Sequence, residues 1–311
     1  MQPLAVIIVT WNARNFIGDA LRSLLIDFAN SQIAAHVLVV DSASSDTTVE
    51  FVEQEFVGTV EVLALEENVG FARANNAGLV HLGFTSDTPI APFVLLLNPD
   101  TITQQGATAS LLSVMQSDKT IGMAGANLTY EDGSFQHGAF AFPGLRQLYA
   151  EFFWLPGRLI EGRFNGRYPR YLYQGKQPFD VDFVLGASML LRANVIATTG
   201  MFDEQFFMYG EEVDWQWRIR KAGWRIVCVP TAHIVHLSGL GTSQVKARSV
   251  RNLWESRLRL YGKHYPRWKF IIAKRLLAWG MKRTLKRWQQ QHGDPTIAEA
   301  YLYVIGLASQ P

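Results

Sequence analysis

The chain opens its first buried segment with Leu4-Ala5-Val6-Ile7-Ile8-Val9-Thr10 and continues with Trp11-Asn12. A continuous apolar run of this length is typical of a strand that is buried on both faces. Further strands are expected at Val37–Asp41, Val60–Leu65 and Phe93–Asn98. Helices are expected at Phe16–Asp27, Asp46–Gln54, Gly70–Leu82 and Ala107–Gln116. This alternation predicts an α/β fold whose parallel sheet is covered on both faces.

Polar residues follow each of these strands. They are Thr10 and Asn12, Asp41-Ser42, Glu66-Glu67-Asn68, and Asn98-Pro99-Asp100. Ligands of open α/β sheets bind beyond the carboxyl ends of the strands, where such residues meet. A single polar residue after a strand is commonly part of a turn, but four successive sets at one edge favour a binding site.

The second half of the chain is less regular. Residues 130–180 are rich in Gly, Pro, Tyr and Arg, and we expect loops there that cover the sheet edge or form a lid. Val181–Leu191 is expected to be a buried strand that is interrupted at Gly186-Ala187-Ser188, where small residues would let a ligand approach the backbone. Glu211–Ala222 is expected to be a helix with acidic residues in its first turn, which suits the helix dipole.

Composition excludes several classes of protein. The 311 residues are 48% hydrophobic and carry a formal net charge of +2, so bulk charge does not indicate nucleic acid. The single cysteine, Cys228, lies in an apolar run and is expected to be a core residue; it excludes a disulfide framework and a cysteine-based zinc site. No stretch reaches the ~18 apolar residues of a spanning helix. We therefore expect a cytosolic or membrane-surface protein.

Two groups of residues are candidates for chemistry. Asp100 follows a strand directly, and His236 precedes a Gly-rich loop; together they could bind magnesium or manganese. His233, on the opposite face of an extended segment, is expected to be structural. Glu211, Glu212 and Asp214 open a helix, and like charges this close raise at least one pKa, which suits a general base. Asp214 is better explained by an i,i+4 ion pair with Arg218.

The chain resembles family-2 glycosyltransferases of the GT-A fold from about Val6 to Ser243, and most of all the branch that transfers rhamnose or related sugars. Five segments carry the resemblance: Val6–Asn12, Val39–Asp46, Glu67–Asn76, Leu97–Asp100 and Gly200–Tyr209, which leads into the helix that begins at Glu211. The resemblance implies that Asp41 contacts the pyrimidine, Asn98 faces the ribose, and Asp100 with His236 binds Mn²⁺ or Mg²⁺. The nucleotide-sugar site is expected to contain Thr10, Asn12, Asp41, Ser42, Asn68, Gly70, Phe71, Arg73, Asn75 and Asn98.

The residue that matches the base of the family is Glu212, with Glu211 as the alternative. Two departures from the family pattern are visible. The family commonly has Glu-Asp where this chain has Glu211-Glu212, and Asn98 replaces the first Asp of the Asp-x-Asp motif. The resemblance implies direct displacement with inversion at the anomeric carbon, in which the base deprotonates the acceptor and the metal stabilises the departing diphosphate.

The last quarter of the chain is basic. Nine cationic residues lie between Lys263 and Arg287, interleaved with Trp268 and Trp279. Basic helices with Trp suit an anionic membrane surface; the alternative is a helix that packs on the catalytic domain with a solvated basic face. Nucleic acid is disfavoured because no recognition motif accompanies the charge. We divide the chain into a GT-A domain, 1–245, and a basic helical extension, 246–311.

The sequence therefore predicts a metal-dependent, inverting hexosyltransferase of cell-surface polysaccharide synthesis, peripheral at the cytoplasmic face of the membrane. The expected reaction moves rhamnose from dTDP-rhamnose to a glycan or polyprenyl-diphosphate-linked acceptor. Alternatives are a UDP-hexose transferase and a catalytically inactive homologue that acts in assembly. A nucleotidyltransferase is a weaker alternative, because no Gly-rich basic phosphate loop lies near the first strand.

Overall fold

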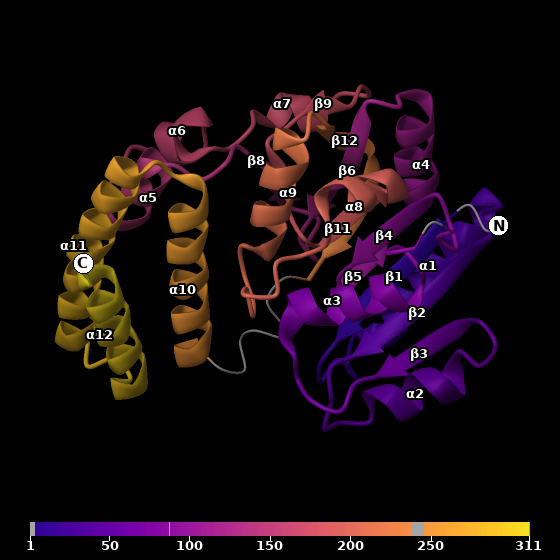
Figure 1. The fold of residues 1–311 in the computed structure, drawn as a ribbon, viewed down its shortest axis with the longest axis horizontal. Coiled ribbons are helices and arrows are strands. Elements are labelled where there is room, and N and C mark those ends of the chain that lie inside the picture. The colour runs from indigo at the N-terminus through magenta and orange to yellow at the C-terminus, as the bar shows by residue number, and fades with distance from the viewer. Residues whose placement is uncertain (1–3, 87, 238–245, 311) are drawn as a thin grey trace.

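A large mixed sheet forms the centre of the protein (Figure 1). The computed structural model describes residues 4–86, 88–237 and 246–310. The main strands are β1 (Leu4–Thr10), β2 (Ala35–Asp41), β3 (Val60–Ala64), β4 (Phe93–Leu97), β5 (Thr101–Thr103), β6 (Ile121–Thr129), β11 (Ser188–Arg192) and β12 (Arg225–His236). Their order across the sheet is β3-β2-β1-β4-β11-β6-β12-β5.

The first four long strands are parallel, as the hydrophobic runs predict. β1 pairs with β2 on one side and β4 on the other, and Thr10 lies opposite Asp41 in the register. The helices between and after them are α1 (Ile17–Ser31), α2 (Thr48–Glu55), α3 (Gly70–His81) and α4 (Ala107–Ser117). Alternate residues of β1 enter two cores, one with α1 and α4 and the other with α3. Both faces of the sheet are therefore covered.

The second half of the sheet is mixed. β11 runs antiparallel to β4 and β6, and β5 runs antiparallel to β12. The interrupted strand near Gly186 is found as β10 (Phe183–Val184), which pairs with β8 (Ala139–Phe140), and β11. Ser188 pairs with Leu97, so β11 starts at the carboxyl edge, where β4 ends, and must run in the opposite direction.

The expectation of loops over residues 130–180 was wrong. Besides β8, this segment contains β7 (Phe135–Gln136), α5 (Leu145–Phe152), α6 (Gly157–Ile160), a 3₁₀ turn (Arg163–Asn165), α7 (Arg170–Tyr173) and β9 (Phe179–Asp180). These elements are too short to give a clear period in the sequence. Leu148 and Phe152 of α5 are buried against the C-terminal helices, so tertiary packing fixes α5.

Three helices make up the described residues after the gap at 238–245: α10 (Lys246–His264), α11 (Arg267–Gln290) and α12 (Pro295–Ser309). They share a hydrophobic cluster with α5, centred on Trp254, Leu277, Met281 and Val304. α10 stands between this layer and α9 (Glu211–Lys221), while α8 (Ala193–Thr199) lies on the sheet side of α9 (Figure 1). Within the described ranges, no helix has the length and apolar character needed to cross a membrane.

A buried carboxylate joins α9 to α10. Asp214 has no exposed surface and accepts hydrogen bonds from Arg218 at 3.0 Å, Lys263 at 2.9 Å and His264 at 2.7 Å. Burial alone would raise the pKa of Asp214, but the bonds from His264 and Lys263 and the charge of Arg218 lower it to about 2. The sequence identified only the Arg218 pair; the two α10 partners appear only in the fold.

We predict that Asp214→Asn lowers the free energy of unfolding by roughly 3 kcal/mol at pH 7, because it removes the buried anion that Arg218, Lys263 and His264 share. A lowered pKa means that the stabilising charge is complete above about pH 4 and is lost as the pH falls toward about 2. Chemical denaturation of the wild type and the variant at a series of pH values measures the loss of unfolding free energy and its dependence on pH. Asp203→Asn, which removes a partly exposed partner of Lys263, is the control and should lose under ~1 kcal/mol. Equal losses would contradict the anchoring role of Asp214.

Candidate active site

A cavity of about 380 Å³ lies at the carboxyl edge of the parallel strands. The ends of β1, β2, β4 and β12 and the starts of α3 and α9 contribute to its wall. It contains Val9, Thr10, Trp11, Phe16, Ser42, Asn68, Gly70, Phe71, Asn98, Pro99, Asp100, Leu185, Gly186, Ala187, Met208, Tyr209, Glu211, Glu212 and His236. None of residues 130–180 is among them, so a lid from that segment over this cavity is not observed.

Most of the residues selected from the sequence meet in this cavity. They are Thr10, Ser42, Asn68, Gly70, Phe71, Asn98, Asp100, Glu211, Glu212 and His236. The remaining four, Asn12, Asp41, Arg73 and Asn75, do not line it. The side chains of these four have other partners, and their proposed donor contacts stay predictions.

Asp41 is buried directly behind the cavity wall. Its carboxylate accepts hydrogen bonds from the Thr10 hydroxyl at 2.9 Å, the Ser44 backbone at 2.8 Å and the Ser44 hydroxyl at 2.5 Å. The Asn12 side chain accepts a bond from the backbone of Ser45 at 2.8 Å, and Asn12 itself has a positive φ of 50°. These bonds tie the turn after β2 to the end of β1.

Arg73 and Asn75 lie on α3. Arg73 is exposed and pairs with Glu204 at 3.5 Å. Asn75 is buried, and its amide donates to the Phe71 carbonyl one turn earlier at 2.9 Å. In this structure both side chains therefore contact the protein rather than the cavity.

Strand pairing brings Asp100 and His236 together. His236 lies opposite Thr101 in the β12–β5 register, and its Nε2 is 3.5 Å from Oδ1 of Asp100. Both side chains are largely buried. A six-coordinate Mg²⁺ with bonds of about 2.1 Å separates neighbouring ligand atoms by about 3 Å, so one ion can contact both groups. Among the described residues, no three His, Cys, Asp or Glu side chains gather as a metal site, so further ligands have to come from substrate or water.

Glu211 and Glu212 form a pair of buried acids at the start of α9. Burial raises the pKa of Glu211 well above its usual value, and the charge of Glu212 raises it further. Burial also raises the pKa of Glu212, although backbone hydrogen bonds and Arg257 oppose this. One oxygen of each side chain is buried without a hydrogen-bond partner in the described part of the chain. Burial therefore favours the neutral form of both carboxyl groups, and their titration belongs to the pair.

Two other acids, Asp203 and Asp182, have partners outside the cavity. Asp203 pairs with Lys263 at 2.7 Å, and Asp182 accepts a bond from the Phe142 backbone at 2.9 Å. Neither lines the cavity.

Several cavity residues were not selected from the sequence. Trp11 and Phe16 follow β1, and Met208 and Tyr209 precede α9. Trp11 and Tyr209 belong to motif segments and could have been found there, because an aromatic ring beside a polar strand end is suited to stacking on a ligand. Phe16 carries no such signal, since it also fits the helix that follows it.

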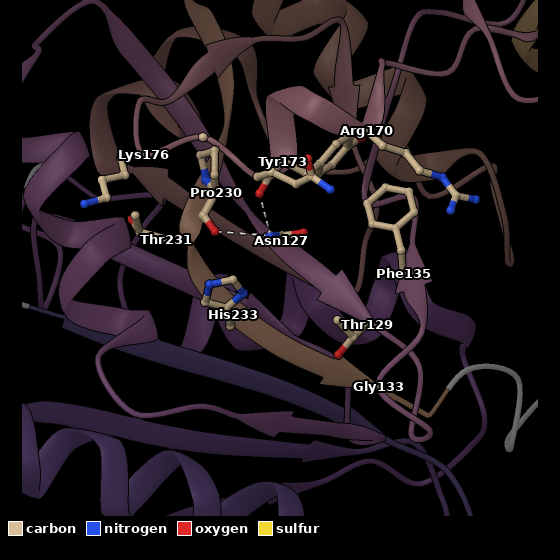
Figure 2. Close-up of a pocket in the computed structure, with 12 residues that line it drawn as sticks. Asn127, Thr129, Gly133, Phe135, Arg170, Tyr173, Lys176, Pro230, Thr231 and His233 are labelled. Atoms are coloured by element: carbon tan, nitrogen blue, oxygen red, sulfur yellow. Dashed lines mark hydrogen bonds between the residues drawn. The ribbon is translucent and has the colours of Figure 1, made fainter.

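A second cavity of about 540 Å³ lies along β6 and β12 beside α7 (Figure 2). The amide of Asn127 points to the backbone carbonyls of Tyr173 and Pro230, and His233 lies below them (Figure 2). None of its twelve lining residues is Asp or Glu, and two of them are Arg170 and Lys176. This cavity therefore supplies no carboxylate, either as a base or as a metal ligand, and the cavity with Glu212 remains the candidate active site.

A covered mixed sheet with an acidic cavity at its carboxyl edge fits the GT-A glycosyltransferase fold. A sequence profile described as "Glycosyltransferase like family 2" matches residues 2–269 of the chain. The chain therefore belongs to glycosyltransferase family 2, and it is a glycosyltransferase. It is 28% identical over 244 residues to an N-acetylglucosaminyl-diphospho-decaprenol L-rhamnosyltransferase of Mycobacterium tuberculosis. The aligned region covers 75% of this chain and 75% of that relative.

Solved structures share the fold. A mannosyltransferase from Pyrobaculum calidifontis in complex with GDP-Man and Mn²⁺ has a TM-score of 0.57 at 16% identity, over 98% of this chain and 86% of its own. S. aureus TarS 1-349 has a TM-score of 0.52 at 18% identity, over 98% of this chain and 90% of its own. The GT-A fold and the C-terminal helices expected from the sequence are confirmed.

Gly70 fixes the wall of the cavity, and its replacement tests that wall. Its φ is +80°, and an added Cβ would lie 2.4 Å from the Phe207 carbonyl oxygen. Gly70→Ala should therefore displace the loop that carries Met208 and Tyr209, weakening nucleotide-sugar binding and lowering the melting temperature. Gly106→Ala is a matched control, because Gly106 also has φ +80° but open space around it, so only backbone strain of ~1 kcal/mol applies. Calorimetry compares the melting temperatures of the two variants, and titration compares their affinities for nucleotide sugar. Equal losses in the two variants would contradict the explanation that the Phe207 carbonyl excludes a side chain at Gly70.

Proposed function

We propose that the enzyme transfers rhamnose from dTDP-rhamnose to a polyprenyl-diphosphate-linked glycan, with Glu212 as the base and inversion at the anomeric carbon. The observation that carries the proposal is the buried Glu211–Glu212 pair in the same cavity as Asp100 and His236. The sugar and the lipid-linked acceptor are inferred from the name of the M. tuberculosis relative.

The donor nucleotide is assigned to the edge formed by β1, β2 and α3. Ser42 accepts a hydrogen bond from the Val69 backbone at 3.1 Å, and Asn68 accepts one from the Gly70 backbone at 3.1 Å. These bonds hold the start of α3 at the cavity, where Gly70 and Phe71 line the wall. The positive end of a helix favours a diphosphate. Asn98, at the end of β4, is assigned to the ribose.

Asp100 and His236 are the residues that would hold a divalent ion with the donor. Their donor set, one carboxylate oxygen and one imidazole nitrogen, suits Mn²⁺ or Mg²⁺, and their 3.5 Å separation fits one ion. When bound, such an ion supplies positive charge that stabilises the departing diphosphate. The Mn²⁺ in the P. calidifontis complex supports this assignment.

Glu212 acts on the acceptor. It accepts the proton of the acceptor hydroxyl as the oxygen forms a bond to the anomeric carbon and the bond from that carbon to the diphosphate oxygen breaks. A raised pKa makes Glu212 a stronger base than an exposed carboxylate. In this proposal Glu212 carries the charge of the pair and Glu211 keeps its proton. Neutral Glu211 avoids a second charge beside it.

The alternatives make different demands on the chain. A UDP-hexose donor uses the same groups and differs only in pocket contacts. An inactive assembly protein predicts loss of the site carboxylates, whereas Asp41, Asp100 and Glu212 are all present. A lipid-linked acceptor also implies that the enzyme works peripherally at the cytoplasmic face of the membrane in cell-surface polysaccharide synthesis.

The donor and metal assignments can be tested by thermal shift. The wild type should be stabilised most by dTDP-rhamnose with Mn²⁺, and less by UDP-sugars or without metal, because a ligand stabilises the fold that it binds. Asp100→Ala should abolish transfer and remove the Mn²⁺ dependence of donor binding. Full activity of the wild type in EDTA would refute the metal assignment, and preference for a UDP-sugar would favour the first alternative.

The base can be tested with two neighbouring isosteric variants. Glu212→Gln should bind donor and metal like the wild type but transfer sugar at least ~100-fold more slowly, because a positioned base contributes roughly 10²- to 10⁴-fold. Glu211→Gln should be milder, because the proposal assigns Glu211 no proton to accept. Single-turnover kinetics with separately measured donor affinity distinguish the two. If only Glu211→Gln loses turnover, the roles are reversed; if both stay active, the base lies elsewhere.

A further inference from the structure

α11 is a cationic helix without acidic residues. Among its 24 residues are Arg267, Lys269, Lys274, Arg275, Lys282, Arg283, Lys286 and Arg287, and no Asp or Glu. Within residues 4–86, 88–237 and 246–310, none of these eight side chains forms an ion pair with a carboxylate. Their charge is therefore available to an anionic partner.

The face of α11 that is turned away from the protein also carries large apolar side chains. Leu277, Met281 and Leu285 are buried against the rest of the helical layer. On the opposite side, Trp268 is 62% exposed and Trp279 is 57% exposed. At 3.6 residues per turn these two tryptophans lie on one face, about 16 Å apart.

The same face contains Ile272, Arg275, Lys282, Arg283 and Lys286 at helical spacing from Trp279. Ile272 and Trp279 therefore share one exposed surface with these cations. They are not a second core-facing stripe, since Ile272 is 43% exposed.

The end of α5 extends this surface. Phe153 stacks on Trp279 with ring centres 4.4 Å apart, and the guanidinium of Arg283 lies 5.6 Å from the Phe153 ring. Trp154, the next residue, is 84% exposed, more than any other large hydrophobic residue described. Segments more than a hundred residues apart therefore build one patch of tryptophans and cations.

We infer that this patch, the α11 face, binds the surface of an anionic lipid bilayer, with Trp154, Trp268 and Trp279 at the headgroup level. We define the α11 face as Trp154, Trp268, Ile272, Arg275, Trp279, Lys282, Arg283 and Lys286. Tryptophan is suited to this level because its ring is apolar and its N–H is polar, and long cationic side chains reach the headgroups from beside it. The cations of α11 are attracted to anionic lipid headgroups, and the exposed tryptophan rings are stabilised by an apolar layer beneath those headgroups. An anionic bilayer combines these two properties.

The inference rests on the proposed function in one respect, that a lipid-linked acceptor lies in a membrane. It adds the surface by which the enzyme meets that membrane. The sequence left two interpretations of the basic tail, membrane binding and packing on the protein. α11 packs on the protein through one face, and its other face, which contains the tryptophans and cations, is exposed.

Co-sedimentation with vesicles tests the inference on the full chain. Vesicles of equimolar phosphatidylglycerol and phosphatidylcholine should bind the wild type, and binding should fall with salt; pure phosphatidylcholine should bind much less. The triple variant Arg275→Glu, Lys282→Glu, Lys286→Glu should bind at least ~100-fold more weakly, because each cation near such a surface contributes to the attraction. Trp154→Ser should weaken binding without affecting the fold, since this side chain is almost fully exposed.

Matched controls come from exposed positions outside the α11 face. Lys119→Glu with Lys176→Glu reverses charge elsewhere, and Tyr171→Ser removes an aromatic side chain that is 69% exposed. These variants should bind anionic vesicles like the wild type. Equal binding of the wild type to neutral and anionic vesicles, or undiminished binding of both α11-face variants, would overturn the inference.

The result is separable from that of the sugar-transfer proposal. The α11-face variants should transfer sugar to a short, water-soluble acceptor at the wild-type rate, and loss should appear only with acceptor in vesicles. A wild type that binds vesicles but transfers no sugar refutes the proposed function and leaves the α11 face intact. If the α11 face instead joins two chains, ultracentrifugation will show a dimer that Trp154→Ser dissociates, and the membrane inference fails.

Discussion

The buried carboxylate of Asp214 connects the parts of the molecule that the proposed reaction needs. Through Arg218 it is linked to the end of α8 and to the loop that follows it, because Arg218 also donates to the backbone carbonyls of Thr199 and Met201. Through Lys263 and His264 it holds the end of α10. α9 in turn carries Glu211 and Glu212 into the cavity. A buried anion is costly unless its partners are in place, so these segments are constrained to one arrangement.

The first half of the fold could be predicted from the sequence because each of its strands and helices is specified by its own short stretch of residues. Each strand there is a short apolar run and each connection is a helix, so parallel order follows from the connections. The direction of β11 could not be predicted in this way. It depends on the chain returning to the sheet at Ser188, opposite Leu97, after the short elements between residues 130 and 187. Those elements are stabilised by α11 and the sheet rather than by their own periodicity.

The site was predictable to the extent that it lies at strand ends. Asp100 and His236 are 136 residues apart, yet the β12–β5 register places them side by side, and each stood at a strand end in the sequence. Asp41 shows the limit of this argument, because its carboxylate at the same edge accepts bonds from Thr10 and Ser44 and is not among the residues that line the cavity. Strand position identifies the edge; side-chain partners decide which residues reach the cavity.

α10 packs against the segments that carry the candidate base. Its Leu260 packs with Phe206 and Val213 beside the candidate base, and its Ser256 donates to the Met208 carbonyl at 2.9 Å. Its Trp254 and Leu258 pack in the C-terminal layer with α11. A truncation at Gly262 would therefore remove not only α11 but also Lys263 and His264, the partners of Asp214, and would disturb α9. Loss of activity after such a truncation would therefore not test membrane binding. Point substitutions on the exposed side of α11 do test it, because they leave the partners of Asp214 in place.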